Sequence, residues 1–251
     1  MGNSKKDNTK TILEIVVIVI LIPAALLLSW KVGDRQYYLF SVIIMILMML
    51  PFFVRFERRR PSARELVTTA VMSALAAASR AAFVMVPHFT PMTGIIMITG
   101  LSLGAEAGFI TGALGAFVSN FVFGQGPWTP WQMFAYGLAG LLFGLLGRKR
   151  SERNDADGRT GPRSLIDSEK RLPTAILGGL VVFCIIGPLL DTATLFLVSM
   201  QVNASSVGAV YMAGVPVNAI HATATFLTLF VLCKPISEKL ERIKVKYGMM
   251  S

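Results

Sequence analysis

Long apolar stretches separated by short polar segments make up most of the chain. Most of these stretches approach or exceed the ~18 residues that predict a membrane-crossing helix. We expect eight helical segments, near residues 11–30, 36–54, 63–86, 92–103, 105–123, 132–146, 173–200 and 207–233. The segment 92–103 is short for a full span, so we expect it to be tilted, broken or extended by its flanks. The pattern predicts an all-α fold, a polytopic membrane helical bundle.

Composition and charge agree with this class and suggest how the bundle is oriented. Hydrophobic residues make up 54% of the chain and charged ones only 15%, so the bilayer is the solvent for most of it. All 24 Lys and Arg except Lys31, Arg35 and Arg80 fall in four groups, which eight spans place on one side. The positive-inside rule makes that side the cytoplasm and both termini cytoplasmic, as expected for a multi-pass protein of the cell membrane. Such clusters touch anionic membrane lipid, and we expect no nucleic-acid partner.

A basic linker separates two parts of different character. Residues 1–60 hold two plain apolar helices and the linker, whereas residues 61–251 are richer in glycine, alanine and polar residues. We interpret the second part as the functional core, with a cytoplasmic loop at 148–171 and a basic C-terminal tail. The charged, glycine-bearing composition of that loop is typical of flexible segments.

Catalytic and metal-binding patterns are missing from the sequence. Cys184 and Cys233 lie in different apolar stretches without the spacing of metal ligands, and we interpret them as packing residues. His88 and His221 are the only two histidines. There is no phosphate-binding GxxxxGK[ST] loop, HExxH helix or GxSxG turn. We therefore expect no metal, no cofactor and no enzymatic activity, and ATP-driven work would need another subunit.

Polar residues inside the spans are the main candidates for a binding site, because such groups are costly there and usually face a cavity or a partner. Arg80, Asn120 and Asp191 are all expected in the outer half of the bundle. Either Arg80 and Asp191 form an ion pair that ties two helices together, or all three line a pocket. Asn218 and His221 are three residues apart and share a helical face.

The segment from Gly124 to Gln132 is expected to cover this pocket. Its prolines stiffen the chain around Trp128 and Trp131, so both rings are expected to be held on a rigid turn. Interfacial anchoring is the alternative role for such tryptophans. The predicted substrate-binding residues are Arg80, His88, Asn120, Trp128, Trp131, Gln132, Tyr136, Asp191, Tyr211, Asn218 and His221.

A face of small side chains on the first helix of the core completes the pattern. Ala70, Ala74 and Ala78 recur at intervals of four and let a partner helix approach closely. Residues 63–234 resemble the substrate-binding S-components of energy-coupling factor (ECF) vitamin transporters. The resemblance is carried by this alanine face together with the six-span layout, the Arg64-Glu65-Leu66 start, the 103–108 turn and the 124–133 loop. The run from Phe123 to Gln132 is similar to the branch that includes cobalamin and queuosine-precursor proteins.

The resemblance implies a six-helix S-component-like core, here preceded by two extra transmembrane helices. It implies a vitamin captured from outside, with cobalamin as the best match, and uptake driven by a transmembrane coupling subunit and two ATPase subunits. Ala70, Ala74 and Ala78 would dock on the coupling subunit. The two extra helices are a departure from the family and are able to cover part of that docking surface.

Three other interpretations remain at the level of sequence. A proton-coupled carrier would use Asp191 as its proton site, although no internal inverted repeat supports it. A membrane-embedded transferase would use Arg80, Asp191 or His221, but the acidic and histidine residues are few and lie on different spans. If the protein is a structural subunit without a ligand, replacing Trp128 or Asp191 would leave cellular uptake of every vitamin unchanged.

Overall fold

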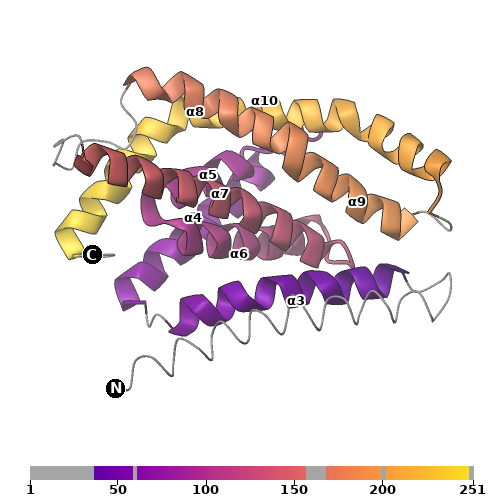
Figure 1. The fold of residues 1–251 in the computed structure, drawn as a ribbon, viewed down its shortest axis with the longest axis horizontal. Coiled ribbons are helices and arrows are strands. Elements are labelled where there is room, and N and C mark those ends of the chain that lie inside the picture. The colour runs from indigo at the N-terminus through magenta and orange to yellow at the C-terminus, as the bar shows by residue number, and fades with distance from the viewer. Residues whose placement is uncertain (1–36, 59–60, 157–167, 199–201, 249–251) are drawn as a thin grey trace.

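The computed structural model describes residues 37–58, 61–156, 168–198 and 202–248. Every regular element in these ranges is a helix, so the expected all-α bundle is confirmed (Figure 1). The expected first helix at 11–30 lies outside the described residues. The helices are α3 (Tyr37–Arg58), α4 (Ala63–Ala82), α5 (Met92–Leu103), α6 (Ala105–Phe123), α7 (Thr129–Ala156), α8 (Ser168–Val181), η2 (Val182–Ile186), α9 (Gly187–Val198) and α10 (Ala204–Tyr247).

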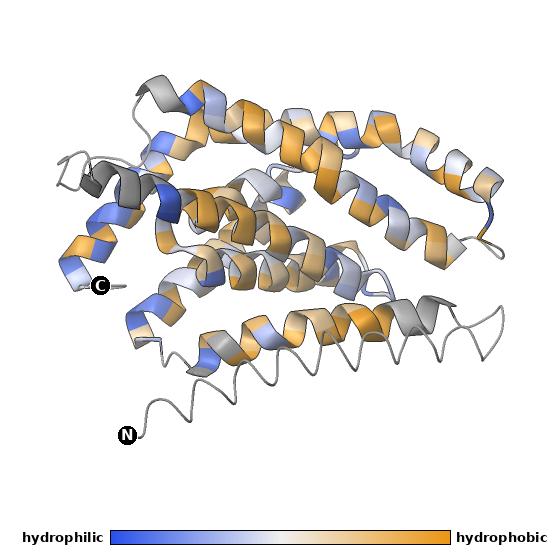
Figure 2. Cartoon of the chain, in the orientation of Figure 1, coloured by the Kyte–Doolittle hydropathy of each residue, from blue (hydrophilic) through white to orange (hydrophobic). Residues whose placement is uncertain are grey.

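Three of the described helical stretches are long and apolar enough to cross a membrane, namely 105–123, 171–197 and 204–247. The second is one continuous stretch in which α8 passes through the short π-helix η2 into α9. Residues 42–54 and 92–103 form shorter apolar helices. Figure 2 shows that apolar residues fill the middle of the bundle, as expected where lipid or other helices surround it.

Helix ends follow local chemistry. α5 and α6 have the predicted bounds, and Gly104 separates them at a φ of 96°, which a residue with a side chain rarely adopts. The Oγ of Ser62 accepts a hydrogen bond from the Glu65 amide and caps α4. Asn203 and Ser206 form a capping box at the start of α10.

Helices extend into the segments expected to form a cytoplasmic loop and a basic C-terminal tail. α7 continues to Ala156 and α8 begins at Ser168, so both ends of the segment 148–171 are helical. The basic tail after Cys233 belongs to α10, which runs on to Tyr247. Lysine and arginine are good helix formers, so a charged segment that leaves the apolar region need not end its helix.

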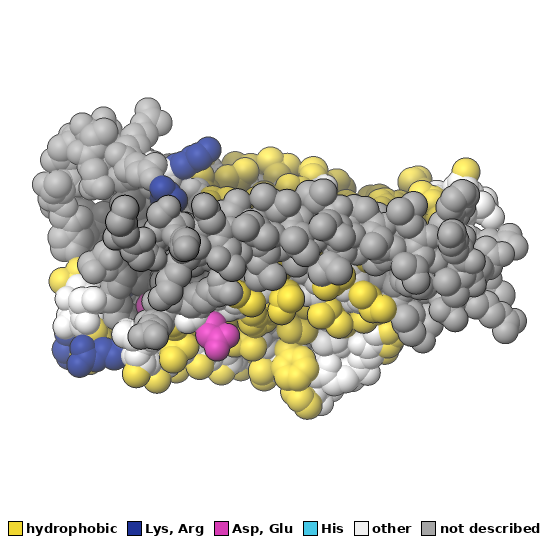
Figure 3. Space-filling view, turned by 60° about the horizontal axis from the view of Figure 1, so that its bottom comes forward, with side chains coloured by type: hydrophobic (Ala, Val, Ile, Leu, Met, Phe, Trp, Pro, Cys, Tyr) yellow, Lys and Arg dark blue, Asp and Glu magenta, His cyan; other side chains and the backbone are white. Residues whose placement is uncertain are grey.

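The described basic segments meet at one end of the bundle, which we call the basic end. The C-terminus of α3, the start of α4, the end of α7, the start of α8 and the end of α10 all lie there (Figure 1). The opposite end, here called the distal end, contains the connections 83–91 and 124–128. In Figure 3 the visible Lys and Arg side chains gather near one end, and hydrophobic side chains make up most of the described surface in view between the two ends.

Glycines allow α5, α6 and α7 to pack with their backbones in contact. A Cβ atom on Gly140 would lie 2.1 Å from the carbonyl oxygen of Gly108, and one on Gly100 would lie 2.1 Å from that of Gly140. Real side chains never approach a backbone this closely. These three helices form the tight centre that positions the distal residues.

The additional helix α3 packs against α6, α7 and α9. Its Phe52 ring stacks on Phe109 of α6 with ring centroids 4.1 Å apart, and Met45 and Met49 are buried in the same cluster. This position leaves the docking face predicted on α4 uncovered, because Ala70, Ala74 and Ala78 are all exposed.

Candidate functional site

Arg80 joins α4 to α6 at the distal end. It lies in the last turn of α4, where its Nη1 donates hydrogen bonds to the Oγ of Ser119 at 2.7 Å and the Oδ1 of Asn120 at 3.0 Å. Its guanidinium carbon lies 4.3 Å from the centre of the Phe123 ring. A planar cation held by two acceptors and an aromatic face is fixed in direction, as a binding site requires.

Asn120 extends this network to α7. The side chain is 1% exposed, and its Nδ2 donates to the Oε1 of Gln132 at 2.8 Å and to the Oγ1 of Thr129 at 3.1 Å. Thr129 in turn donates to the Oε1 of Gln125 at 2.9 Å and accepts from the Gly126 amide. The network therefore runs from α4 through α6 to the 124–128 connection, and it contains three of the predicted site residues.

The two tryptophans of this connection have different environments. Trp128 is 40% exposed, and its indole Nε1 donates to the carbonyl of Gly124 at 3.3 Å. Trp131 is 4% exposed, lies inside α7 and packs 6.0 Å from the Phe196 ring. The expectation of a turn that holds both rings is wrong for Trp131, because Pro130 stands in the first turn of a helix, where proline is tolerated.

A second polar group lies between α5, α7 and α10. The Nε2 of His221 is 2.7 Å from the Oγ1 of Thr93, and the His221 ring meets the edge of Tyr136 at 5.9 Å. All three side chains are buried.

A third polar group joins α9 to α10. The Nδ2 of Asn218 donates to the Oδ2 of Asp191 at 2.7 Å. The hydroxyls of Thr192 and Tyr211 lie 2.8 Å apart between the same two helices. Gly214 makes room for the carboxylate, because a Cβ there would lie 2.4 Å from its oxygen. This group follows directly on the π-helix η2, an irregularity that often accompanies functional sites.

The ion pair considered between Arg80 and Asp191 is not formed. Within the described residues the two side chains contact different partners, Arg80 those of α6 and Asp191 that of α10. His88 is exposed in the connection after α4 and adopts a φ of 61°, unusual for a residue with a side chain. No three His, Cys, Asp or Glu residues of the described segments are placed to hold a metal ion.

Several polar partners were not singled out from the sequence. Thr93, Ser119, Thr129 and Thr192 all bond to predicted residues. Hydroxyl residues are common in membrane helices, where they bond to their own backbone, and this makes each one inconspicuous. Their spacing offered one signal, because Ser119 directly precedes Asn120 and Thr192 directly follows Asp191.

The comparisons with known proteins give a family. A family model described as "ECF-type riboflavin transporter, S component" matches residues 60–238. No curated protein and no solved structure matches the chain. The matched range contains α4 to α9, most of α10 and every predicted site residue, but it does not include α3.

Proposed function

Because this chain belongs to the family of S components of ECF-type riboflavin transporters, we propose that it captures a vitamin outside the cell for ATP-driven uptake by partner subunits. The family is one of substrate-binding transport subunits, not of enzymes. The observation that supports the proposal is the set of hydrogen-bonded polar side chains at the distal end, centred on the half-buried Arg80 and the buried Asn120 and His221.

Riboflavin is the first candidate ligand, because the matching family is named for it. Arg80, Gln132 and Asn218 offer hydrogen-bond donors and acceptors at the distal end, and Tyr136 and Trp128 offer aromatic faces. This combination suits a flat ring system with several polar edges. Cobalamin, or a queuosine precursor, is the second candidate, supported by the run from Phe123 to Gln132.

We assign the exposed Trp128 and the 124–128 connection to a cover over the bound vitamin. The Thr129 and Asn120 hydrogen bonds link this connection to the Arg80 network below it. Vitamin binding that engages Arg80 would therefore be transmitted to the cover. Trp131 would support the cover from the core, since it packs on Phe196 of α9.

The alanine face of α4 is proposed as the docking surface for the transmembrane coupling subunit, which would act with two ATPase subunits. Ala70, Ala74 and Ala78 are exposed, and α3 lies on other helices. Small side chains allow another helix to pack closely in lipid. The proposed orientation has both termini and the basic end in the cytoplasm and the distal end outside.

Calorimetric titration of the purified protein in detergent tests the proposal, with riboflavin, cobalamin and a queuosine precursor in parallel. We expect saturable binding of one of them, riboflavin first, weakened at least about tenfold by Gln132→Ala, since a hydrogen bond to a ligand contributes about that much. Phe121→Ala is the matched control, because Phe121 is 70% exposed on α6 and makes no polar contact. Folded protein that binds none of the three would contradict the proposal.

The proton-coupled carrier is the second candidate function, and one observation supports it. Asp191 is a carboxylate half-buried between two apolar helices and hydrogen-bonded to Asn218. Intramembrane carboxylates of this kind serve as proton sites in transporters. The two candidates differ in their energy source, since the carrier works without ATPase subunits and stops when a proton gradient is collapsed.

A further inference from the structure

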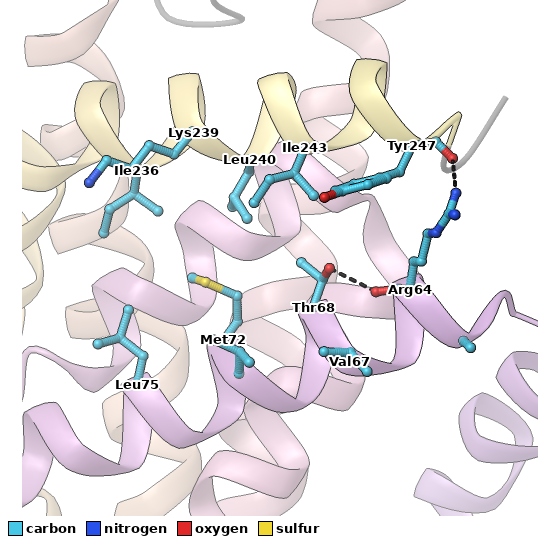
Figure 4. Close-up of a pocket in the computed structure, with 12 residues that line it drawn as sticks. Arg64, Val67, Thr68, Met72, Leu75, Ile236, Lys239, Leu240, Ile243 and Tyr247 are labelled. Carbon is cyan, nitrogen blue, oxygen red and sulfur yellow. Dashed lines mark hydrogen bonds between the residues drawn. The ribbon is translucent and has the colours of Figure 1, made fainter.

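An elongated groove of about 780 Å³ runs between the first half of α4 and the last part of α10. Figure 4 shows side chains from the two helices facing each other across it, with Arg64 opposite Tyr247 at one end and Leu75 near Ile236 at the other. The groove lies toward the basic end, away from the distal polar groups described above. Its apolar lining includes Val67, Val71, Met72, Leu75, Leu240 and Ile243.

The apolar part of the groove is open to its surroundings. Val67 is 62% exposed, Val71 is 58% exposed and Leu75 is 42% exposed. Each lies on the surface of α4 that would face the lipid of a bilayer surrounding this bundle. An acyl chain is the ligand that such a long, open and apolar channel accommodates without an unsatisfied polar group.

The groove also has cationic groups with hydrogen-bonding capacity to spare. Arg64 carries five N–H donors, and its described hydrogen bond is a 3.5 Å contact to the Tyr247 carbonyl. The Arg64 guanidinium lies 4.9 Å from the centre of the Tyr247 ring, which holds it at the end of the groove (Figure 4). Lys246 is exposed and its Nζ lies 5.3 Å from the centre of the same ring, whereas the amine of Lys239 lies near Ile236 at the other end of the groove (Figure 4). Arginine, lysine and a tyrosine hydroxyl are the groups that bind phosphate.

We propose that this groove binds one anionic glycerophospholipid, with an acyl chain between α4 and α10 and the phosphate at Arg64, Tyr247 and Lys246. Charge complementarity selects an anionic over a zwitterionic headgroup, because two cations lie against the Tyr247 ring at this end of the groove. The site adjoins the exposed alanine face through Val67 and Val71, so the lipid would border any helix that docks on Ala70 or Ala74. The proposal does not depend on which vitamin is captured.

Native mass spectrometry of the delipidated full-length protein tests it, with phosphatidylglycerol and phosphatidylcholine of identical acyl chains as the two probes. We expect one phosphatidylglycerol to bind at least about tenfold more tightly than phosphatidylcholine, as expected when two cations meet an anionic headgroup. Arg64→Gln with Lys246→Gln should remove this preference. Lys234→Gln with Arg242→Gln is the control, because it removes two positive charges from α10 at residues that neither line the groove nor lie over the Tyr247 ring.

A second variant tests the acyl site without changing charge. Val71→Trp fills the groove from an exposed position and should abolish retention of phosphatidylglycerol while the protein stays folded. Equal affinity for both lipids, or retention unchanged in Arg64→Gln with Lys246→Gln, would overturn the proposal. A third result would also overturn it: the protein retains neither lipid, and Val71→Trp disrupts a dimer or a complex with the coupling subunit. The groove would then be a binding site for a protein partner.

Discussion

Asn218 donates a 2.7 Å hydrogen bond from its side-chain amide to the carboxylate of Asp191, and this bond joins α10 to α9 near the distal end. Two glycines make the pairing possible. A Cβ on Gly214 would collide with the carboxylate, and a Cβ on Gly187 would lie 2.4 Å from the Asn218 side chain. The pair is therefore part of the contact between α9 and α10. The two candidate functions differ in the role that they give to the negative charge of Asp191.

The substitution Asp191→Asn separates the transporter subunit from the proton-coupled carrier. It keeps the size of the side chain and an acceptor for Asn218 but removes the charge. For a vitamin-binding subunit we expect weaker binding, by about tenfold, because a charge-assisted hydrogen bond becomes a neutral one. Uptake in cells that express the partner subunits should persist at saturating vitamin and should not respond to a protonophore at constant ATP.

Asp191→Leu is the matched comparison. It leaves the Asn218 amide, which is 6% exposed, without its acceptor, so we expect a loss of about 1–3 kcal/mol in stability beyond the effect on binding. Uptake that needs no ATPase subunit, collapses with the proton gradient and is lost in Asp191→Asn would instead favour the carrier.

Arg80→Lys tests the network at the end of α4. A lysine is able to carry the charge, but it cannot reproduce the planar contact with Phe123 while bonding to Ser119 and Asn120. We expect vitamin affinity to fall about tenfold and the free energy of unfolding to fall by about 1 kcal/mol. Calorimetry and thermal unfolding in detergent measure the two effects.

The control for this prediction is Arg242→Lys, at an exposed arginine near the end of α10. It should leave both quantities unchanged. Affinity that is identical in Arg80→Lys and in the unmodified protein would place the vitamin away from the Arg80 network.

The sequence was most informative where glycine and apolar residues decide the structure. The bounds of α5 and α6 were predicted because Gly104 interrupts two apolar stretches. The end of α10 is not predictable in this way. The charge in residues 234–246 indicates a basic tail, whereas these residues continue the helix and the Nζ of Lys244 donates a hydrogen bond to the Ser102 carbonyl. Apolar patterning ends at the membrane boundary, but helical hydrogen bonding does not.

The candidate site was predicted in its residue types but not in its pairings. Arg80, His221 and Asp191 each belong to a hydrogen-bonded polar group, and these are three separate groups. Which residues pair depends on how the helices rotate about their axes, and single-sequence spacing does not encode that rotation. For this reason Arg80 bonds to Asn120 on α6 and not to Asp191 on α9.

Gly140→Ala tests the tight packing at the centre of the bundle. Its Cβ would lie 2.1 Å from the Gly108 carbonyl oxygen, and a backbone group cannot move aside as a side chain can. We expect a loss of about 3 kcal/mol in stability, the upper range for overpacking, measured as a lower unfolding temperature in detergent. Gly208→Ala on α10 is the control, because no atom lies within 4 Å of its added Cβ and alanine favours the helix. Equal unfolding temperatures for the two variants would contradict the close approach of α6 and α7.

Ala74→Leu separates vitamin capture from partner docking. Ala74 is exposed on α4, and the hydrogen bonds of the distal network on this helix are made by Arg80, so a larger side chain at Ala74 should leave folding and vitamin affinity unchanged. It would hold an approaching helix away from the smooth face, and we expect co-purification of the coupling subunit to fall about tenfold, the loss typical of a disturbed small-residue interface. Ala219→Leu, at an exposed alanine of α10, is the control and should co-purify normally. Undiminished assembly in Ala74→Leu would move the docking surface to another face, whereas loss of vitamin binding in the same variant would show that the two roles share one site.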